Sequence, residues 1–372
     1  KMKDRWEEIS RLLQWRNSRD NTDDVLYERV LKAMEDIVND SIIRTDPEWI
    51  GVSIFSRNSR RLGKDLLSFI RSKFPNKKLI IGGMGLGDSL GDTKFEYAVE
   101  LFELGLVDYY ITGEAELNIV ELICNNTTRP GINSPMKQIM QLEELAFADY
   151  TDCDHDLYPF SEYDSGLPTY VLTGSRGCFR RCDFCDVYRF WPKFKSRGGE
   201  HIAKEMIYHY EQRGVYNFSF SDSLINGNMK TFRELVDILI DYLKKIDVKF
   251  RWGGQFICRS DRQMPLEDYI KASNAGLESV GIGLEHASER IRKLMRKGFD
   301  NDALHDTIHN LSKSNIHTMM NMMSGHPSET EDDHNENLKF LESYRWAGNN
   351  GTIAMNLQHC IAFLPGTNFF DK

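Results

Sequence analysis

From residue 168 onward the sequence repeats one unit, an apolar run of strand length followed by a stretch with helical periodicity. Strands that alternate with helices in this way are typical of a parallel sheet, in which reactive groups lie at the carboxyl ends of the strands. The expected strands are Thr169–Thr173, Val215–Phe220, Val248–Trp252, Ser279–Leu284, Ile316–Met323 and Thr352–Gln358. The expected helices are His201–Gln212, Thr231–Lys245, Leu266–Asn274, Ser288–Arg296, Ala303–Ser314 and Glu331–Ser343. We therefore expect an α/β fold of six β/α units.

Three cysteines directly follow the first of these strands. Cys178, Cys182 and Cys185 have the spacing Cys-x-x-x-Cys-x-x-Cys. Three thiolates this close together can bind one iron–sulfur cluster, and because a 4Fe-4S cluster takes four ligands, one iron is left without a cysteine. The spacing predicts a cluster with one iron open to another ligand.

A structural zinc site, a disulfide pair and three unrelated buried thiols are the alternatives for these cysteines. Zinc normally takes a fourth Cys or His at a comparably short spacing, whereas the next His is His201 and the next Cys is Cys258. Disulfides are disfavoured because the chain has seven cysteines, an odd number, and its first residues do not have the pattern of a secretory signal. The iron–sulfur interpretation is favoured over all three.

The cysteine run, with the aromatic Phe184 just before the last cysteine, resembles the signature of the radical S-adenosylmethionine (SAM) superfamily. The resemblance implies a partial (β/α)6 barrel of the TIM type, a 4Fe-4S cluster on Cys178, Cys182 and Cys185, and SAM on the open iron. In that superfamily an electron from the cluster cleaves SAM to methionine and a 5'-deoxyadenosyl radical, which abstracts a hydrogen atom. An enzyme that modifies an unactivated carbon is therefore expected.

Polar residues at the ends of later strands resemble the SAM-binding positions of the superfamily. Ser221, Asp222 and Ser223 stand where many members have Gly-Gly-Glu, and their oxygens suit the SAM ammonium group. Glu285 ends the fourth strand, and the resemblance implies that it hydrogen-bonds the SAM ribose; a carboxylate that merely favours a helix N-terminus is the alternative. The fifth strand ends in a turn similar to Gly-x-Pro-Gly-Glu-Thr, with Ser328 replacing the second glycine.

The residues before the barrel have a different pattern. Amphipathic helices are expected at Asp4–Trp15 and Asp24–Val38, followed by an alternating β/α half-sheet. Its expected strands are Trp49–Phe55, Lys78–Ile81 and Val107–Thr112, and its expected helices are Leu62–Lys73 and Lys94–Leu104. This part resembles the later half of the cobalamin-binding Rossmann-like domain that often precedes a radical SAM barrel. The resemblance rests on Gly82-Gly83 and on a Gly-Glu-x-Glu helix start containing Glu114, and it implies that Gly82, Gly83 and Glu114 bind the cofactor.

Cobalamin binding is left open by two departures from that domain. The Asp-x-His-x-x-Gly motif that places a His below cobalt is absent, since no His precedes His155, and the first two strand units of the domain are missing. The domain therefore either binds cobalamin without a His ligand or serves as a scaffold.

The reaction that follows hydrogen abstraction depends on this point. Methyl transfer is favoured if cobalamin binds, and a rearrangement, cyclisation or oxidation is expected otherwise. Methylthiolation is disfavoured because members that catalyse it carry a second cysteine trio near the N-terminus, whereas the first cysteine here is Cys124. Outside enzymes, the alternative is a non-catalytic iron–sulfur protein for electron transfer or sensing, which the expected SAM positions disfavour.

Composition limits the partners. The chain has 372 residues, 41% of them hydrophobic, and a net charge of −9, which disfavours nucleic acid as a general partner. Without an apolar run of about 20 residues, we expect a cytoplasmic protein, with no membrane contact, that acts on a small-molecule or peptide substrate. The expected divisions are a helical segment (1–45), the Rossmann-like domain (46–124), a linker (125–167) and the barrel (168–372).

Basic residues are concentrated around the cysteines. We call them the basic collar: Arg176, Arg180, Arg181, Arg189, Lys193, Lys195 and Arg197. A run of this kind either faces water or attracts an anionic partner. The second interpretation predicts an acidic electron donor, such as a flavodoxin or a ferredoxin, or an anionic substrate.

Overall fold

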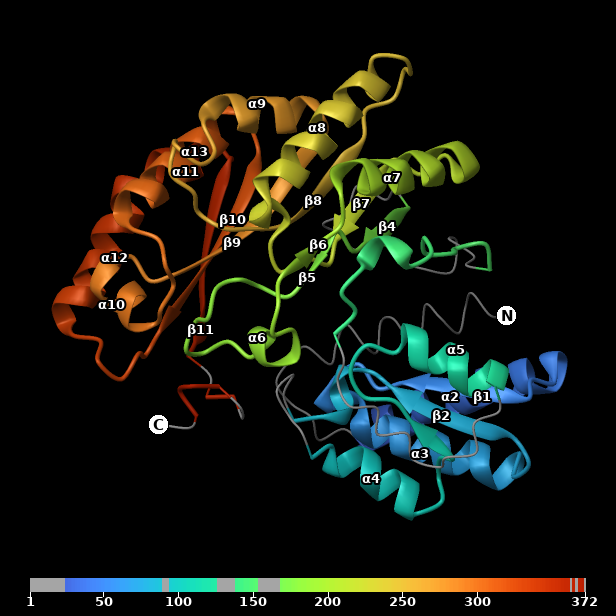
Figure 1. Cartoon of the computed structure of the whole chain (residues 1–372). Helices are drawn as coiled ribbons and strands as arrows, with labels where there is room; N and C mark the ends of the chain where they lie inside the picture. Colours follow the sequence, from blue (N-terminus) through green and yellow to red (C-terminus); the bar gives the residue numbers. More distant parts are fainter. Residues whose placement is uncertain are drawn as a thin grey trace. The chain divides into compact units, whose positions relative to one another are not determined.

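The computed structural model describes residues 24–88, 94–125, 138–152, 168–361, 363–364 and 367–370 (Figure 1). It divides into two compact units, of which the first comprises Lys1–Ile139 and Tyr150–Tyr163, and the second Met140–Asp149 and Asp164–Lys372. The helix expected at Asp4–Trp15 lies outside the described residues. Among the described residues, no helix has the length and apolar character that crossing a bilayer requires.

The first unit contains a three-stranded parallel sheet in the order β1-β2-β3. Its strands are β1 (Trp49–Ser53), β2 (Lys78–Gly82) and β3 (Tyr109–Tyr110), and its α-helices are α2 (Asp24–Thr45), α3 (Arg60–Lys73), α4 (Glu96–Glu103) and α5 (Glu116–Asn125). Short 3-10 turns, η1 (Arg57–Ser59) and η2 (Met84–Leu86), follow β1 and β2. The expected half-sheet is therefore present, with a third strand of only two paired residues.

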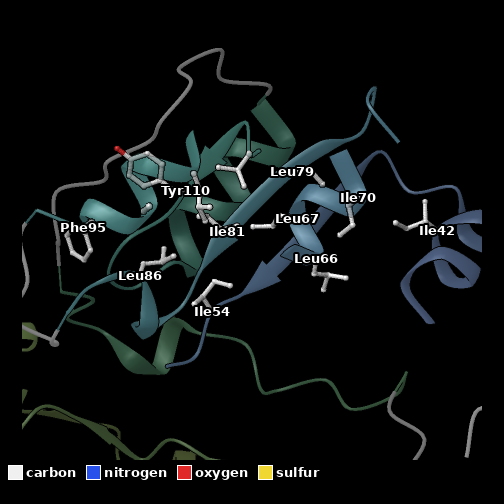
Figure 2. Close-up of a cluster of buried hydrophobic side chains, with 13 residues drawn as sticks. Ile42, Ile54, Leu66, Leu67, Ile70, Leu79, Ile81, Leu86, Phe95 and Tyr110 are labelled. Atoms are coloured by element: carbon white, nitrogen blue, oxygen red, sulfur yellow. The ribbon is translucent and has the colours of Figure 1, made fainter. Parts of the chain in front are cut away.

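The core of the first unit forms between this sheet and its helices (Figure 2). Leu67 of α3 and Leu79 of β2 are completely buried, and Ile70 and Ile81 are nearly so. The three central residues of β2 are buried in succession, which is typical of a parallel strand covered on both faces.

The second unit contains a six-stranded parallel sheet in the order β11-β10-β9-β8-β7-β4. The strands are β4 (Thr169–Leu172), β7 (Asn217–Phe220), β8 (Arg251–Phe256), β9 (Leu277–Glu285), β10 (His317–Ser324) and β11 (Ile353–Cys360). All six expected strands are present, with ends shifted by at most four residues. Each strand pairs with the next along the chain, and β4 and β11 are the sheet edges. This order confirms the expected α/β architecture of six successive β/α units.

Helices connect these strands. They are α6 (Val187–Phe190), α7 (Gly199–Arg213), α8 (Met229–Leu243), α9 (Leu266–Asn274), α10 (Glu289–Leu294), α11 (Asn301–Lys313), α12 (Glu331–Ser343) and α13 (Arg345–Asn349). In α8 the buried residues Phe232, Leu235, Val236 and Leu239 follow the spacing of one helix face, which explains why the helix packs along the sheet. The N-terminus of α8 is fixed by Asn228, whose side chain accepts hydrogen bonds from two backbone N–H groups.

Candidate functional site

The cysteine loop leaves the carboxyl end of β4 through the short strand β5 (Ser175–Arg176), which pairs antiparallel with β6 (Lys195–Ser196). Gly177 then turns the chain with a φ of 81°, and a Cβ there would lie 2.9 Å from Cβ of Trp191. Only glycine fits both this backbone angle and this space. The strand pair and the glycine thus fix where the loop starts.

The three thiols suit an iron–sulfur cluster by their chemistry. Cys182 is buried and Cys178 and Cys185 are half-buried. Burial raises the pKa of all three thiols, that of Cys185 to about 11, and each thiol lies within electrostatic range of another. Within the described residues, no three Cys, His, Asp or Glu side chains are already arranged to hold a metal ion. Metal binding would therefore displace the thiol protons and draw the three sulfurs together.

Phe184 anchors the loop to the region of α10. Its ring packs against the buried side chains of Ile291 and Met295, and the backbone N–H of Asp183 donates to the carbonyl of Met295 at 3.1 Å. The loop is therefore attached to the α10 region as well as to β4.

Glu285 lies close to the cysteine loop at the end of β9. It is buried and has a φ of 67°, and its carboxylate accepts a hydrogen bond from the ammonium of Lys297 at 2.6 Å. Lys297 lies 5.6 Å from the ring centroid of Phe184, and both charged groups are close enough to Cys182 to affect its pKa. A Cβ at Gly283 would lie 2.3 Å from the Glu285 carboxylate, so this glycine makes room for it. The structure thus brings Phe184, Glu285 and Cys182 together around Lys297.

Lys297 was not assigned a role from the sequence. Burial is the largest single effect and would lower the pKa of its ammonium group, but the Glu285 carboxylate and the nearby thiols of Cys182 and Cys258 together outweigh it, and the pKa is raised. Lys297 follows the strand-end Glu285 by twelve residues, which is the one sequence feature that could have pointed to it. This spacing alone does not show that the chain brings the two side chains together.

The end of β7 presents the three residues that were expected to hold the SAM ammonium group. Ser221 is exposed and its hydroxyl lies 2.9 Å from that of Thr173, whereas Ser223 is half-buried. Asp222 is buried, and burial raises the pKa of its carboxyl to about 7. Its oxygens accept hydrogen bonds from the chain itself, so the contacts of Asp222 differ from those expected of a SAM ligand.

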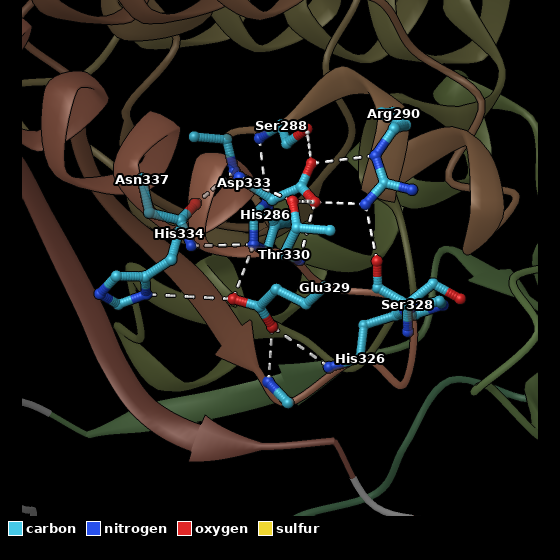
Figure 3. A network of polar contacts seen from close by, with 12 residues as sticks. His286, Ser288, Arg290, His326, Ser328, Glu329, Thr330, Asp333, His334 and Asn337 are labelled. Carbon is cyan, nitrogen blue, oxygen red and sulfur yellow. Dashed lines mark hydrogen bonds and ion pairs between the residues drawn. The ribbon is translucent and has the colours of Figure 1, made fainter.

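A polar network joins the end of β9 to the end of β10 (Figure 3). The side chain of His286 is fully buried, with Nε2 3.2 Å from a carboxylate oxygen of Glu329. The other Glu329 oxygen accepts from the backbone N–H groups of Gly325 and His326. Glu329 therefore closes the turn after β10. The positive φ of this turn, 88°, belongs to Gly325, which explains why Ser328 can replace the second glycine of the superfamily turn.

Asp333, in the first turn of α12, extends this polar network. Its carboxylate accepts hydrogen bonds from the hydroxyls of Ser288 and Thr330, each at 2.7 Å, and forms an ion pair with Arg290 (Figure 3). The Arg290 contact and these hydroxyls hold the pKa of Asp333 well below its usual value. The connections after β9 and β10 are thus held together next to Glu285.

The basic collar is only partly a surface. Arg181, Arg189 and Lys193 are exposed, and the first two lie over the ring of Tyr188. Arg197, in contrast, is buried and its guanidinium forms an ion pair with Glu205 at 2.5 Å. The expectation that Arg197 helps to attract an anionic partner is therefore wrong, because its charge is neutralised inside the unit by Glu205.

The glycines of the first unit approach their own chain closely. Gly83 has a φ of 104°, and a Cβ there would lie 2.5 Å from the carbonyl oxygen of Ile54. At Gly85 a Cβ would lie 2.7 Å from the same oxygen. Gly82 has more space, because a Cβ there would lie 3.7 Å from the carbonyl oxygen of Ile111. Small residues at Gly83 and Gly85 therefore let the chain that follows β1 approach closely.

Glu114 differs from expectation in its place and contacts. Helix α5 begins at Glu116, two residues later, and the Glu114 carboxylate accepts a hydrogen bond from the backbone N–H of Ile139. The Gly-Glu-x-Glu run thus leads into the helix instead of starting it.

The chain is similar to known proteins over the span that contains the cysteine loop. Residues 172–341 match the model of the radical SAM superfamily, a span that runs from β4 into α12 and contains all three cysteines. An uncharacterized methyltransferase of Pyrococcus horikoshii is 26% identical over 261 residues, which are 64% of this chain and 54% of the relative. The anaerobic magnesium-protoporphyrin IX monomethyl ester cyclase of Synechocystis sp. is 23% identical over 292 residues, 75% of this chain and 56% of the relative. The chain thus spans about half the length of these curated relatives.

A solved structure extends the likeness to both units. The radical SAM methyltransferase TsrM of Kitasatospora setae, solved with cobalamin and a 4Fe-4S cluster bound, matches with a TM-score of 0.68 at 15% identity. The match covers 90% of this chain and 68% of TsrM. At this identity the likeness concerns the fold. The matched family model covers less than half of the chain, and within it the span that carries the cysteine loop at the end of β4 is similar to the radical SAM superfamily.

Proposed function

We propose that this protein cleaves SAM reductively at a 4Fe-4S cluster held by Cys178, Cys182 and Cys185 and modifies an unactivated carbon of a small-molecule or peptide substrate. The observation that carries the proposal is the position of the cysteine loop, at the carboxyl end of β4, with the Glu285–Lys297 pair beside Cys182. In sheets of this kind the carboxyl ends of the strands are where catalysis takes place.

Each expected site residue has a separate role in this reaction. A bound cluster would supply the electron that splits SAM into methionine and a 5'-deoxyadenosyl radical. The three cysteines would hold three irons and leave the fourth to SAM. Glu285 accepts hydrogen bonds from the SAM ribose hydroxyls, and Lys297 donates a hydrogen bond to this buried carboxylate. Phe184 fixes the loop against Ile291 and Met295, which limits the positions that the cysteines can take.

Methyl transfer with cobalamin in the first unit is the reaction we favour. Its support is the likeness of the fold to cobalamin-bound TsrM and the relative named as a methyltransferase. A bound cobalamin would supply the methyl group. Because no His precedes His155, residues 1–139 of this unit would offer no His side chain to cobalt.

The cobalt ligand can be tested by magnetic resonance. Protein labelled with nitrogen-15 is incubated with hydroxocobalamin, freed of excess, reduced to Co(II) and examined by electron paramagnetic resonance. The expected spectrum has no splitting from nitrogen-15, whereas such splitting would reveal a protein nitrogen on cobalt. The label separates protein nitrogen from the nitrogen of the cofactor's own base.

A cobalamin-independent radical reaction, with the first unit as scaffold, is the second candidate. The specific observation in its favour is that Gly83 and Gly85 lie against the Ile54 carbonyl and that Glu114 is bonded to Ile139. Failure of the protein to retain any cobalamin would select this candidate, with a rearrangement, cyclisation or oxidation as the reaction.

An acidic electron donor completes the proposal. The exposed members of the basic collar, Arg181, Arg189 and Lys193, lie on or just after the cysteine loop. A flavodoxin or ferredoxin would be attracted by them, and their closeness to the cluster suits electron transfer.

The products of SAM test the proposed reaction. Protein reconstituted anaerobically with iron and sulfide is reduced and given SAM, and the adenosyl products are quantified. Reductive cleavage yields 5'-deoxyadenosine and methionine, and methyl donation to cobalamin yields S-adenosylhomocysteine as well. A reconstituted, reduced protein that forms neither product would rule out the proposed function.

A further inference from the structure

Asp222 connects the end of one strand to the start of the cysteine loop on the next. Its side chain is buried, with the residue 3% exposed. One carboxylate oxygen accepts a hydrogen bond from the backbone N–H of Gly174 at 2.8 Å, and the other accepts from the hydroxyl of Ser175 at 2.5 Å. Gly174 and Ser175 precede Cys178 by four and three residues. Asp222 therefore holds the segment from which the cluster ligands emerge.

Arg197 binds the same segment through that segment's carbonyl groups. Its backbone N–H donates to the carbonyl of Gly174 at 2.8 Å, and its guanidinium donates to the carbonyl of Thr173 at 2.9 Å. The ion pair with Glu205 fixes the guanidinium in turn. At the start of the loop, Asp222 thus accepts hydrogen bonds from the donor groups and Arg197 donates to the carbonyl groups.

A carboxylate is the side chain that this position requires. Two donors, an N–H and a hydroxyl, converge on it, and the two carboxylate oxygens accept from both, whereas an asparagine keeps one acceptor oxygen and would require the Ser175 hydroxyl to turn and accept instead of donate. The surroundings leave little room for rearrangement, because a Cβ on Gly174 would lie 3.2 Å from Asp222 and 3.1 Å from Ile202. Both oxygens of Asp222 are also turned into the protein, while the neighbouring Ser221 is exposed.

We propose that Asp222 is a positioning residue for the cluster ligands and does not bind SAM. It fixes Gly174 and Ser175, and through them the angle at which Cys178 and the following cysteines meet the cluster. The SAM ammonium contact at this strand end then falls to the exposed Ser221. This inference rests on the proposed function, because it requires a cluster on the loop.

The test compares two buried aspartates. Asp222→Asn leaves one acceptor oxygen where Asp222 has two. Asp333→Asn is the matched control, since Asp333 is equally buried (3% exposed) and also accepts from a serine hydroxyl, but near β9 and β10. Ser175→Ala is a milder variant that removes only the hydroxyl donor. Each protein is reconstituted identically, and three quantities are measured: iron and sulfide content, the rate of iron loss to a chelator, and the electron paramagnetic resonance spectrum of the reduced cluster. The unfolding temperature of each apoprotein is recorded alongside.

Asp222→Asn and Ser175→Ala are expected to lose iron faster than the wild type, roughly 10-fold for Asp222→Asn, as for other groups that orient metal ligands. Their cluster spectra should be altered. Asp333→Asn should lower the unfolding temperature while keeping the wild-type cluster. SAM affinity, measured per intact cluster, should change little in Asp222→Asn.

Two results would overturn the inference. The first is a normal cluster in Asp222→Asn with weakened SAM binding, which would make Asp222 a SAM ligand. The second is equal cluster loss in Asp333→Asn, which would show general destabilisation. If Asp222→Asn does not fold, Ser175→Ala decides alone, and a stable cluster in it contradicts the inference. Wild-type protein that takes up no iron would instead refute the proposed function itself.

Discussion

The ammonium of Lys297 lies 2.6 Å from the carboxylate of Glu285, and neither side chain is more than 16% exposed. Removing one member of such a pair leaves the other charge buried without compensation, which costs more than the pair contributes. The pair therefore ties the stability of the second unit to the residue expected to bind the SAM ribose.

Glu285→Gln should weaken SAM binding by about 1.5 to 3 kcal/mol, because charge-assisted hydrogen bonds to the ribose are lost. It should also lower the free energy of unfolding by up to roughly 3 to 5 kcal/mol, since Lys297 loses its partner. The double variant Glu285→Gln/Lys297→Met should recover much of the stability but not the SAM affinity. SAM titration of reconstituted protein and urea unfolding measure the two effects, and unchanged SAM affinity in Glu285→Gln would leave Glu285 with a structural role only.

The stability of the apoprotein should depend on pH through Asp222. Burial raises the pKa of this carboxyl from 3.8 to about 7 in the folded protein. Between these two values the folded state binds more protons than the unfolded state, so the contribution of Asp222 to stability falls as pH rises from about 4 to about 7. Above pH 7 that loss is complete. Asp222→Asn lacks this titration.

Urea unfolding of the wild type and of Asp222→Asn between pH 4.5 and 8 checks this prediction. The difference in unfolding free energy, wild type minus variant, should decrease up to about pH 7 and then level off. Parallel curves over the whole range would mean that the pKa of Asp222 is not raised.

Gly83→Ala and Gly82→Ala should separate packing from cofactor binding in the first unit. At Gly83 the positive φ and the Ile54 carbonyl both oppose a Cβ, so alanine should lower the unfolding free energy by at least about 2 kcal/mol without any cofactor. At Gly82 the Cβ has room, and the change should stay within about 0.5 kcal/mol. Cobalamin retention is then measured in Gly82→Ala. A Gly83→Ala protein as stable as the wild type would contradict the packing described for this turn.

Much of the architecture can be predicted from the sequence, because the spacing of apolar residues indicates which faces of strands and helices are buried. The six strands of the second unit are apolar runs bounded by polar segments, and helices such as α9 and α12 begin and end where expected. The cysteine loop could be placed because it directly follows such a run.

Side-chain direction at strand ends could not be predicted in the same way. The run Ser221-Asp222-Ser223 shows three polar residues, but only the fold reveals that Asp222 points inward and Ser221 outward. Arg197 lies in a run of basic residues that resembles an exposed surface. Its burial depends on the ion pair with Glu205, eight residues later in α7. Tertiary packing determines such hydrogen-bond and ion-pair partners, and the spacing of residues along the chain does not predict them.

Reduction by an acidic protein donor should depend on the exposed part of the basic collar. Arg181→Glu/Lys193→Glu should slow reduction by flavodoxin at low salt by roughly 10-fold or more. Added salt should slow the wild-type reaction, since screening acts over about 10 Å at 0.1 M. Reduction by dithionite should change much less. Equal losses with both reductants would show that the charges affect the cluster and do not recruit the donor.

The most direct test of the central claim removes each cysteine in turn. Cys178→Ala, Cys182→Ala and Cys185→Ala should each lose the 4Fe-4S cluster and all formation of 5'-deoxyadenosine, because every thiolate binds one iron. Cys124→Ala, exposed and in the first unit, and Cys258→Ala, buried outside the loop, are the matched controls and should keep the cluster. Iron and sulfide analysis together with 5'-deoxyadenosine from reduced, SAM-treated protein is the measurement. Cluster and cleavage lost only in the three loop variants is the predicted result; a loop variant that still forms 5'-deoxyadenosine, or a wild type that binds zinc instead of iron, would contradict the account.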